Sequence, residues 1–292
     1  MAYNKITLYD GIKCNYLALN KGLSSIEERN NFNSATYTPN WYNTNKQLIM
    51  ANYKNTLSSS LIEGLTEPIS GWNIYRQKSG DARQYLIATV PQTQLFLIDY
   101  LCSNTGEYRY TIVPITATQL GVSLQSSLIK NDFDKYILMS IKQVEDNIYI
   151  PDELWAFSYN IPVPSVVQNT TATVLPTYAR LPKFSQGESN YKTITVSCLL
   201  GGIKSHGYDY YESLELLKRW NEFVAKGNLC VWKDLKGDMT LCKINANPTY
   251  SSLADGVNMP TVLSFELVEI CEFNDMSVCS STDKVYSQLE NA

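Results

Sequence analysis

Short runs of alternating apolar and polar residues fill the chain from Gln47 onward, and turn residues separate them. The runs recur at about eight to twelve residues, a spacing typical of β-sandwiches. Strands are predicted at KQLIMANYK, SSSLIEGL, GWNIYRQ, QYLIATV, FLIDYL, EYRYTIVPI and SSLIKNDF. Because this pattern has the period of a strand and not of a helix, it predicts a mainly β protein.

Length and composition agree with that prediction. A chain of 292 residues is longer than one hydrophobic core usually serves, so we expect two domains of roughly 100–150 residues each. Tyrosine is abundant, at 21 residues, and only 18% of positions are charged. Such a composition favours pleated, half-buried surfaces over long helices with ion-paired faces.

Two segments of the first half resemble strands of fibronectin type III domains. Gly71–Arg76 is similar to the third strand, with aromatic and β-branched residues at alternate positions, and Gly106–Ile112 is similar to the sixth. Leu86–Val90 and Leu97–Tyr100 stand where the fourth and fifth strands belong. The resemblance covers about residues 47–130. It implies a sandwich in which the hydroxyl of Tyr108 ties a chain corner to the backbone.

The second half contains the one predicted helix, over residues 211–226. Its apolar residues recur at intervals of three and four, which places them on one face: Leu214, Leu217, Trp220, Phe223 and Val224. Asp209 is a candidate cap at its start, and Gly227 can end it in the left-handed conformation. A hairpin follows, with its turn at Lys236–Asp238, and then a last strand at Thr261–Ile270.

The order of these elements resembles the distal tail proteins and baseplate proteins of bacteriophages. Two strands, VVQNTTATVL and NYKTITVSCLLG, flank a polar connection that contains Arg180 and Pro182, and Asn190 and Tyr191 open the second strand. The resemblance spans about residues 160–273. It implies a β domain with one helix that forms a closed ring, whose strands and helix bury their edges against neighbouring subunits.

These observations predict four segments. Residues 1–43 are an N-terminal arm, residues 44–130 a fibronectin type III-like β-sandwich, residues 131–273 a distal-tail-like or tail-tube-like β domain with the helix, and residues 274–292 a polar tail. The arm contains the polar stretch SSIEERNNFNSATYTPNWYNTN, which buries too little apolar surface to fold alone. We therefore expect that a chain without residues 1–43 keeps both domains folded but does not assemble.

Several partners are not expected. The net charge is −4 and the longest cluster of basic residues is a pair, so the positive surface that nucleic acid requires is missing.

The seven cysteines are widely spaced without a C-x-x-C pair, which indicates free thiols made in a reducing cytoplasm. Four of them, Cys198, Cys230, Cys242 and Cys271, lie in apolar runs and are expected to be buried. The N-terminus does not resemble a signal peptide, and no apolar stretch is long enough for a membrane span.

Catalytic signatures are scarce. His206 is the one histidine, and a zinc site there would need further ligands at suitable spacing. Cys198 is the nearest candidate nucleophile, but an apolar strand disfavours its thiolate. Glycosidases need only two carboxylates, for which the candidates are Asp99, Glu107, Glu145, Asp146, Asp152 and Glu153. Asp255–Asn258 does not complete a calcium loop. We therefore expect no enzyme, no cofactor and no bound metal.

Aromatic residues are the stronger functional indication, because aromatic residues are enriched at protein interfaces. They gather before the helix and in the arm, where they are Tyr208, Tyr210, Tyr211, Phe32, Tyr37, Trp41 and Tyr42. Filling of the local core explains them equally well. The expected contact elements are Asn31–Trp41, Leu229–Lys243 and Ser251–Pro260, which are polar segments decorated with apolar residues.

Three functions are compared. The first is a structural component of a phage tail or baseplate, which forms or decorates a ring of its own copies, with a hexamer as the candidate ring, and connects the tail tube to hub, fibre or other tail proteins. It would be assembled in the host cytoplasm and become part of the virion. The alternative is a cell-surface or carbohydrate-binding module of the β-sandwich type. A carboxylate enzyme is the third, and it would need a concave pocket with acids of perturbed pKa.

Overall fold

The computed structural model describes residues 15–21, 25–29, 47–53, 65–93, 96–131, 135–145, 148–157, 162–175, 183–200, 203–204, 207–208, 210–252, 261–271 and 284–285. The protein is mainly β, as predicted, with one helix among these residues. The chain divides into two compact units. Unit 1 comprises residues 1–156, 231–239 and 273–292, and unit 2 comprises residues 157–230 and 240–272.

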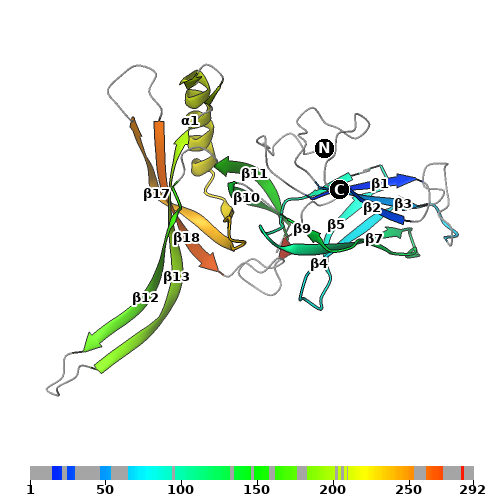
Figure 1. Ribbon diagram of the computed structural model, residues 1–292. Coiled ribbons are helices and arrows are strands. Elements are labelled where there is room, and N and C mark those ends of the chain that lie inside the picture. The colour runs from blue at the N-terminus through cyan, green and yellow to red at the C-terminus, as the bar shows by residue number, and fades with distance from the viewer. Residues whose placement is uncertain are drawn as a thin grey trace. The chain divides into compact units, whose positions relative to one another are not determined.

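Two sheets of unit 1 have the arrangement of a β-sandwich (Figure 1). The first has the order β5-β4-β7-β8, with β9 also paired to β7, and the second has the order β2-β3-β1-β6. The bounds of these strands are β1 Asn15–Lys21, β2 Ser25–Arg29, β3 Gln47–Tyr53, β4 Gly71–Lys78, β5 Tyr85–Pro91, β6 Phe96–Asp99, β7 Glu107–Ile115, β8 Leu124–Gln125 and β9 Ile129–Lys130.

The alternation in β4 and β7 determines the core of this sandwich. Alternate residues of each strand face the interior, and they are buried: Trp72, Ile74 and Arg76 in β4, and Tyr108, Tyr110 and Ile112 in β7. The two strands are antiparallel, with Ile74 opposite Ile112 and Arg76 opposite Tyr110. The strands predicted at residues 46–54, 71–77, 84–90, 96–101 and 107–115 are therefore confirmed within a few residues at each end. The strand predicted at SSSLIEGL falls almost wholly outside the described residues.

The expected N-terminal arm instead supplies strands to the sandwich. β1 pairs in parallel with β3 over its whole length and antiparallel with β6, and β2 pairs antiparallel with β3. β1 precedes the polar stretch, whereas β2 is the described part of it, and the backbone of β3 supplies the hydrogen bonds that let this charged segment form a strand. Deletion of residues 1–43 would remove β1 and β2 from the sandwich, and thermal unfolding of the shortened chain tests the prediction that both domains stay folded.

Further strands of unit 1 follow the sandwich in sequence. They are β10 Tyr136–Glu145, β11 Ile148–Phe157, β16 Leu229–Lys233 and β19 Lys284–Val285, in the sheet order β16-β10-β11-β19. Only the part of β16 from Val231 onward belongs to this unit, and Phe157 at the end of β11 belongs to unit 2. The rings of Tyr136 and Trp232 stack with centroids 5.6 Å apart, which fixes β16 to β10.

Unit 2 is a sheet with one helix. Its strands have the order β12-β13-β18-β17, with bounds β12 Ser165–Leu175, β13 Lys183–Leu200, β17 Met239–Ser252 and β18 Thr261–Cys271; two short strands, β14 Ile203–Lys204 and β15 Gly207–Tyr208, pair with each other. The last predicted strand is confirmed, and it buries one alternate set of side chains, Leu263, Phe265 and Leu267.

Helix α1, Tyr210–Ala225, begins one residue before the predicted start and ends one residue before the predicted end. Trp220 and Phe223 are buried, and the Trp220 ring lies 4.8 Å from that of Phe265 in β18. Leu214 departs from the predicted apolar face, because 38% of its surface is exposed. Gly227 ends the helix with a left-handed φ of 60°, as predicted, whereas Asp209 lies outside the described residues.

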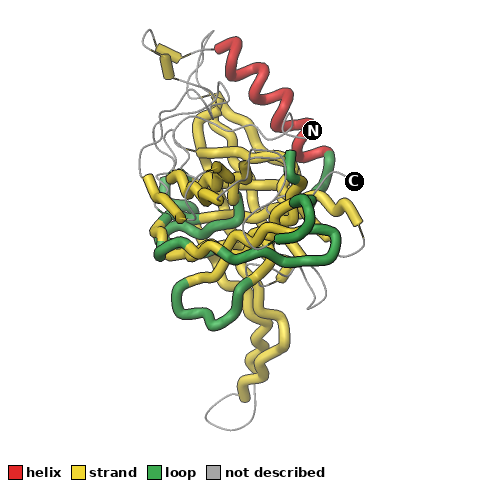
Figure 2. Tube along the Cα trace, turned by 90° about the vertical axis from the view of Figure 1, so that its right-hand side faces the viewer, coloured by secondary structure: helices red, strands yellow, loops and turns green. Residues whose placement is uncertain are grey.

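Strands β12 and β13 extend beyond the rest of their sheet as a two-stranded ribbon (Figures 1 and 2). β13 pairs with β18 only over Thr193–Leu200. Residues 183–192 of β13 pair with β12 alone among the described strands. At about 3.3 Å per residue, this stretch is roughly 30 Å long.

The compact units divide the chain at a different place from the predicted boundary between residues 130 and 131. The first unit continues to Ala156, and residues 231–239 from the second half also belong to it. The predicted polar tail, residues 274–292, is described only at β19, which pairs in parallel with β11. The described helix is too short and too polar to cross a membrane.

Candidate functional site

A buried ion pair joins the two sheets of the sandwich. Arg76 of β4 and Asp99 at the end of β6 are 1% exposed, and the guanidinium Nη1 lies 3.0 Å from both carboxylate oxygens of Asp99. The Tyr110 hydroxyl of β7 donates to the same carboxylate at 2.7 Å, and the backbone N–H of Leu101 donates at 3.0 Å. Asp99, at the end of a strand of one sheet, is thus met by two side chains of the other sheet and by the loop that follows it.

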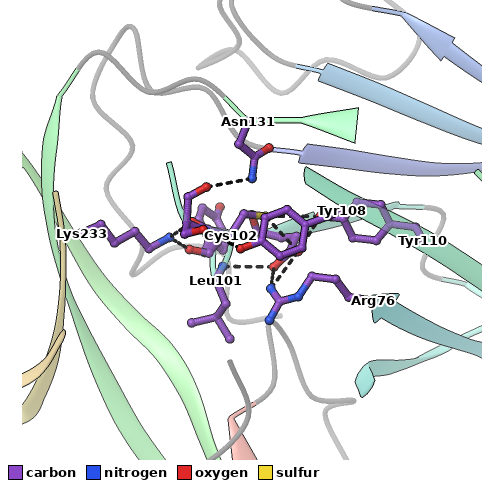
Figure 3. A network of polar contacts seen from close by, with 10 residues as sticks. Arg76, Leu101, Cys102, Tyr108, Tyr110, Asn131 and Lys233 are labelled. Atoms are coloured by element: carbon purple, nitrogen blue, oxygen red, sulfur yellow. Dashed lines mark hydrogen bonds and ion pairs between the residues drawn. The ribbon is translucent and has the colours of Figure 1, made fainter. Parts of the chain in front are cut away.

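That loop, Tyr100–Gly106, is also tied to Tyr108. The backbone N–H of Ser103 donates to the Tyr108 hydroxyl at 2.9 Å, so the predicted contact between this hydroxyl and a chain corner is confirmed. The Arg76 guanidinium lies over the Tyr108 ring, 5.3 Å from its centroid, a distance suited to a cation–π interaction. The Asn131 amide donates to the Ser103 carbonyl at 3.3 Å. Figure 3 shows these side chains converging on the loop.

Lys233 of β16 reaches the loop from the opposite side (Figure 3). It is buried, and its ammonium donates to the Tyr100 carbonyl and, at 3.1 Å, to the Cys102 carbonyl. Both acceptors are backbone groups of one short loop. A residue from far along the sequence therefore provides hydrogen bonds to two backbone carbonyls of this loop.

The turn after Lys233 docks on the same loop. Asp234 Oδ1 accepts the N–H groups of Lys236, Gly237 and Asp238, each at 2.8 Å, which holds the turn in shape as an Asx motif. The turn predicted at Lys236–Asp238 is thereby confirmed. The Asn104 amide donates to the Leu235 carbonyl at 2.8 Å.

The loop and the turn fit closely at Gly237. Its φ of 103° is in the left-handed region, and a Cβ there would lie 2.6 Å from the Asn104 carbonyl oxygen and 2.8 Å from Thr105 Oγ1. Thr105 itself has a φ of 55°, an unfavourable conformation for a β-branched residue. Such strain persists only where surrounding contacts impose it, and here the docked turn provides them.

The described cysteines are buried and free of disulfides: Cys102, Cys198, Cys230 and Cys242. Burial raises the pKa of the Cys102 thiol well above its ordinary value, and the nearby charge of Asp99 raises it further. Burial alone raises the pKa of Cys198 to about 12. Neither thiol is therefore activated as a thiolate nucleophile at neutral pH. The predicted burial is confirmed for Cys198, Cys230 and Cys242, and the Cys271 side chain is outside the described residues.

The candidate carboxylates have separate surroundings. Asp99 is engaged by Arg76 and Tyr110, Glu107 is exposed at the start of β7, and Asp152 is partly exposed. Glu153 is buried, and its backbone N–H donates to the Ser140 hydroxyl at 3.1 Å. Glu145 and Asp146, like His206 and Asp255–Asn258, have side chains outside the described set. No group of three potential metal ligands occurs among the described residues.

The predicted contact elements have different outcomes. Asn31–Trp41 lies outside the described residues, and so does most of Ser251–Pro260, apart from the end of β17. The hairpin Leu229–Lys243 is described, and its turn is occupied within the chain by the loop Tyr100–Gly106. Sequence reasoning missed Arg76, although the alternation that places Trp72 and Ile74 in the core also places Arg76 there.

The ribbon is the surface that sequence reasoning did not identify as a contact element. β12 is the outermost strand of its sheet, and its sequence SVVQNTTATVL contains no charged residue. Val166 and Val167, on opposite faces, are 58% and 51% exposed. Long uncharged edge strands invite pairing with another chain, and the absence of charge from this run was visible in the sequence.

No protein-family model matches this chain, and a comparison with curated proteins finds no match.

Proposed function

We propose that this protein is a non-enzymatic structural component of a bacteriophage tail or baseplate. It forms or decorates a ring of its own copies and connects the tail tube to hub, fibre or other tail proteins. Assembly takes place in the host cytoplasm, and the protein ends as part of the virion tail. The resemblance of residues 160–273 to distal tail proteins supports this assignment, together with one structural observation.

That observation is the ribbon of β12 and β13. A two-stranded hairpin is at best marginally stable alone in water, yet residues 183–192 of β13 pair only with β12 among the described strands. Val166 and Val167 add exposed apolar side chains on both faces of β12. A ribbon of this kind is suited to a protein whose neighbours complete it.

The buried network supports the same role. Arg76, Asp99, Cys102 and Tyr110 are each at most 1% exposed, so a substrate could not reach them in this conformation. Their contacts join the two sheets of the sandwich, which suits an adaptor domain in a particle. Among the described tryptophans, Trp72, Trp155, Trp220 and Trp232 are buried, so none offers the exposed stacking platform of a carbohydrate-binding module.

Particles released by cells that carry the gene provide the test. Antibodies raised against the purified chain should label these particles at the tail, visible by immunogold electron microscopy, and the chain should be present in the mass spectrum of gradient-purified particles. Particles that lack the chain while the cytoplasm contains it would overturn the proposal. A glycan array run with the same protein distinguishes the alternative, because a binding module would give selective, saturable signals.

A further inference from the structure

The edge strand β12 differs from the other edge strands in the described part of the chain. The edge strand β2 has the charged sequence SIEER, and β5 ends at Pro91. β6 has four residues and ends at Asp99, and the remaining edge strands, β8, β9, β14, β15 and β19, have two residues each. Charge, shortness and proline are the features that keep sheet edges from pairing with other chains. β12 has 11 residues, without charge or proline.

The composition of β12 is suited to pairing with an identical strand. In a two-fold antiparallel pair, equivalent residues of both copies meet near the axis, so a charged residue there would face its own like charge. β12 instead carries amides and hydroxyls around its centre, in the run Gln168–Thr171. A hydroxyl at the axis can pair with its own copy, because it is both a donor and an acceptor. The side chains of Gln168 and Asn169 are hydrogen-bonded to Asn190 and Thr193 of β13.

We propose that two copies of this chain join edge to edge through β12, antiparallel and centred on Thr170. Full-length pairing of strand Ser165–Leu175 with its copy places Thr170 opposite itself and Val166 opposite Val174. The register of β12 on β13 shifts between Thr170 and Ala172, so this irregularity lies beside the proposed two-fold axis. The regularly paired residues on either side of the shift remain available to pair with the second copy. The inference rests on the proposed structural role, and it identifies a second copy of this chain as the protein's first binding partner.

The alternative occupants are less well matched. The exposed edge of β13 in the ribbon carries Lys183, Glu188 and Lys192, and β2 carries three charges within five residues. An uncharged strand gains nothing from these charges, which would lose hydration on pairing. Self-pairing of β12 avoids that cost.

Charge-swap variants of the full chain test the proposal. Thr170 is exposed, so T170K and T170E should fold normally. The solution mass of the wild-type protein, measured by light scattering at two concentrations that differ tenfold, should be an even multiple of the 33.0 kDa monomer mass. Each variant alone should have half the wild-type mass, because like charges meet across the axis. An equimolar mixture of T170K and T170E should recover the wild-type mass, since Lys then faces Glu.

The matched control is T195K. Thr195 is also an exposed threonine, but its strand β13 pairs there with both β12 and β18, so this variant should keep the wild-type mass. A monomeric wild type at both concentrations overturns the inference, and so does an oligomer that T170K leaves intact. If the mixture of T170K and T170E does not recover the wild-type mass, β12 pairs with a different edge, and the inference is likewise overturned. None of these results bears on whether the chain is found in tail particles, so the two proposals fail separately.

Discussion

At the residue scale, the Arg76–Asp99 pair explains how a core-facing position of β4 can hold a charged residue. The side-chain alternation of β4 directs Arg76 into the sandwich. There, the contacts with Asp99 and the Tyr108 ring offset the free energy that burial of the guanidinium costs. A buried ion pair adds little net stability compared with apolar residues of similar volume. Removal of one partner is nevertheless strongly destabilising, because the charge of the other partner then remains buried without a counter-charge.

We predict that D99N lowers the free energy of unfolding by about 3–5 kcal/mol, because it leaves Arg76 buried without its counter-charge. R76M should cost a similar amount. The double variant should cost clearly less than the sum of both, since the two residues interact directly. Denaturant unfolding measures all three, with E107Q, which neutralises an exposed carboxylate, as the control expected to stay within about 0.5 kcal/mol of wild type. Additive single effects would contradict the coupling.

At the element scale, the β16–β17 turn is held by its docking on the loop Tyr100–Gly106. The chain offers a matched pair of glycines to measure this contact. Gly80 and Gly237 both have left-handed φ values, 86° and 103°, but a Cβ at Gly80 would meet nothing within 4 Å. The same substitution therefore tests backbone strain alone at one site and strain plus collision at the other.

We predict that G80A lowers the free energy of unfolding by about 1 kcal/mol, the cost of placing a side chain at a positive φ. G237A should cost about 1–3 kcal/mol more, since its Cβ would lie 2.6 Å from the Asn104 carbonyl oxygen. Thermal and denaturant unfolding of the two variants, followed in parallel, give the comparison. Equal losses would mean that the turn does not press on the loop.

At the scale of the whole molecule, unit 1 is not contiguous in sequence. Residues 231–239 come after most of unit 2, yet they belong to unit 1 and supply Lys233 and the docked turn. The first half of the chain is therefore not the whole of unit 1, although its strand pattern is that of a complete domain.

We predict that a chain ending at Ala156 unfolds at a lower temperature than unit 1 within the full chain, because it lacks the segment that satisfies the Tyr100 and Cys102 carbonyls. In the full chain, N104A removes the hydrogen bond to Leu235 and should lower the midpoint by a smaller amount. Tryptophan fluorescence and circular dichroism during heating provide the readout. A shortened chain with an unchanged midpoint would show that residues 231–239 are dispensable.

Local pattern alone determined much of this protein. Alternation predicted β4, β5, β7 and β18, the three- and four-residue spacing predicted α1, and Gly227 predicted its end, because these features depend on neighbours within a few residues. The Tyr108 contact was also accessible, since its partner Ser103 is close in sequence. Tertiary structure decided what depends on distant segments. Which strands meet in space decides the partner of Arg76, the docking of Lys233 and the extension of β12 and β13 as a ribbon. The period of a strand shows which side chains share a face, but not which strands lie beside it.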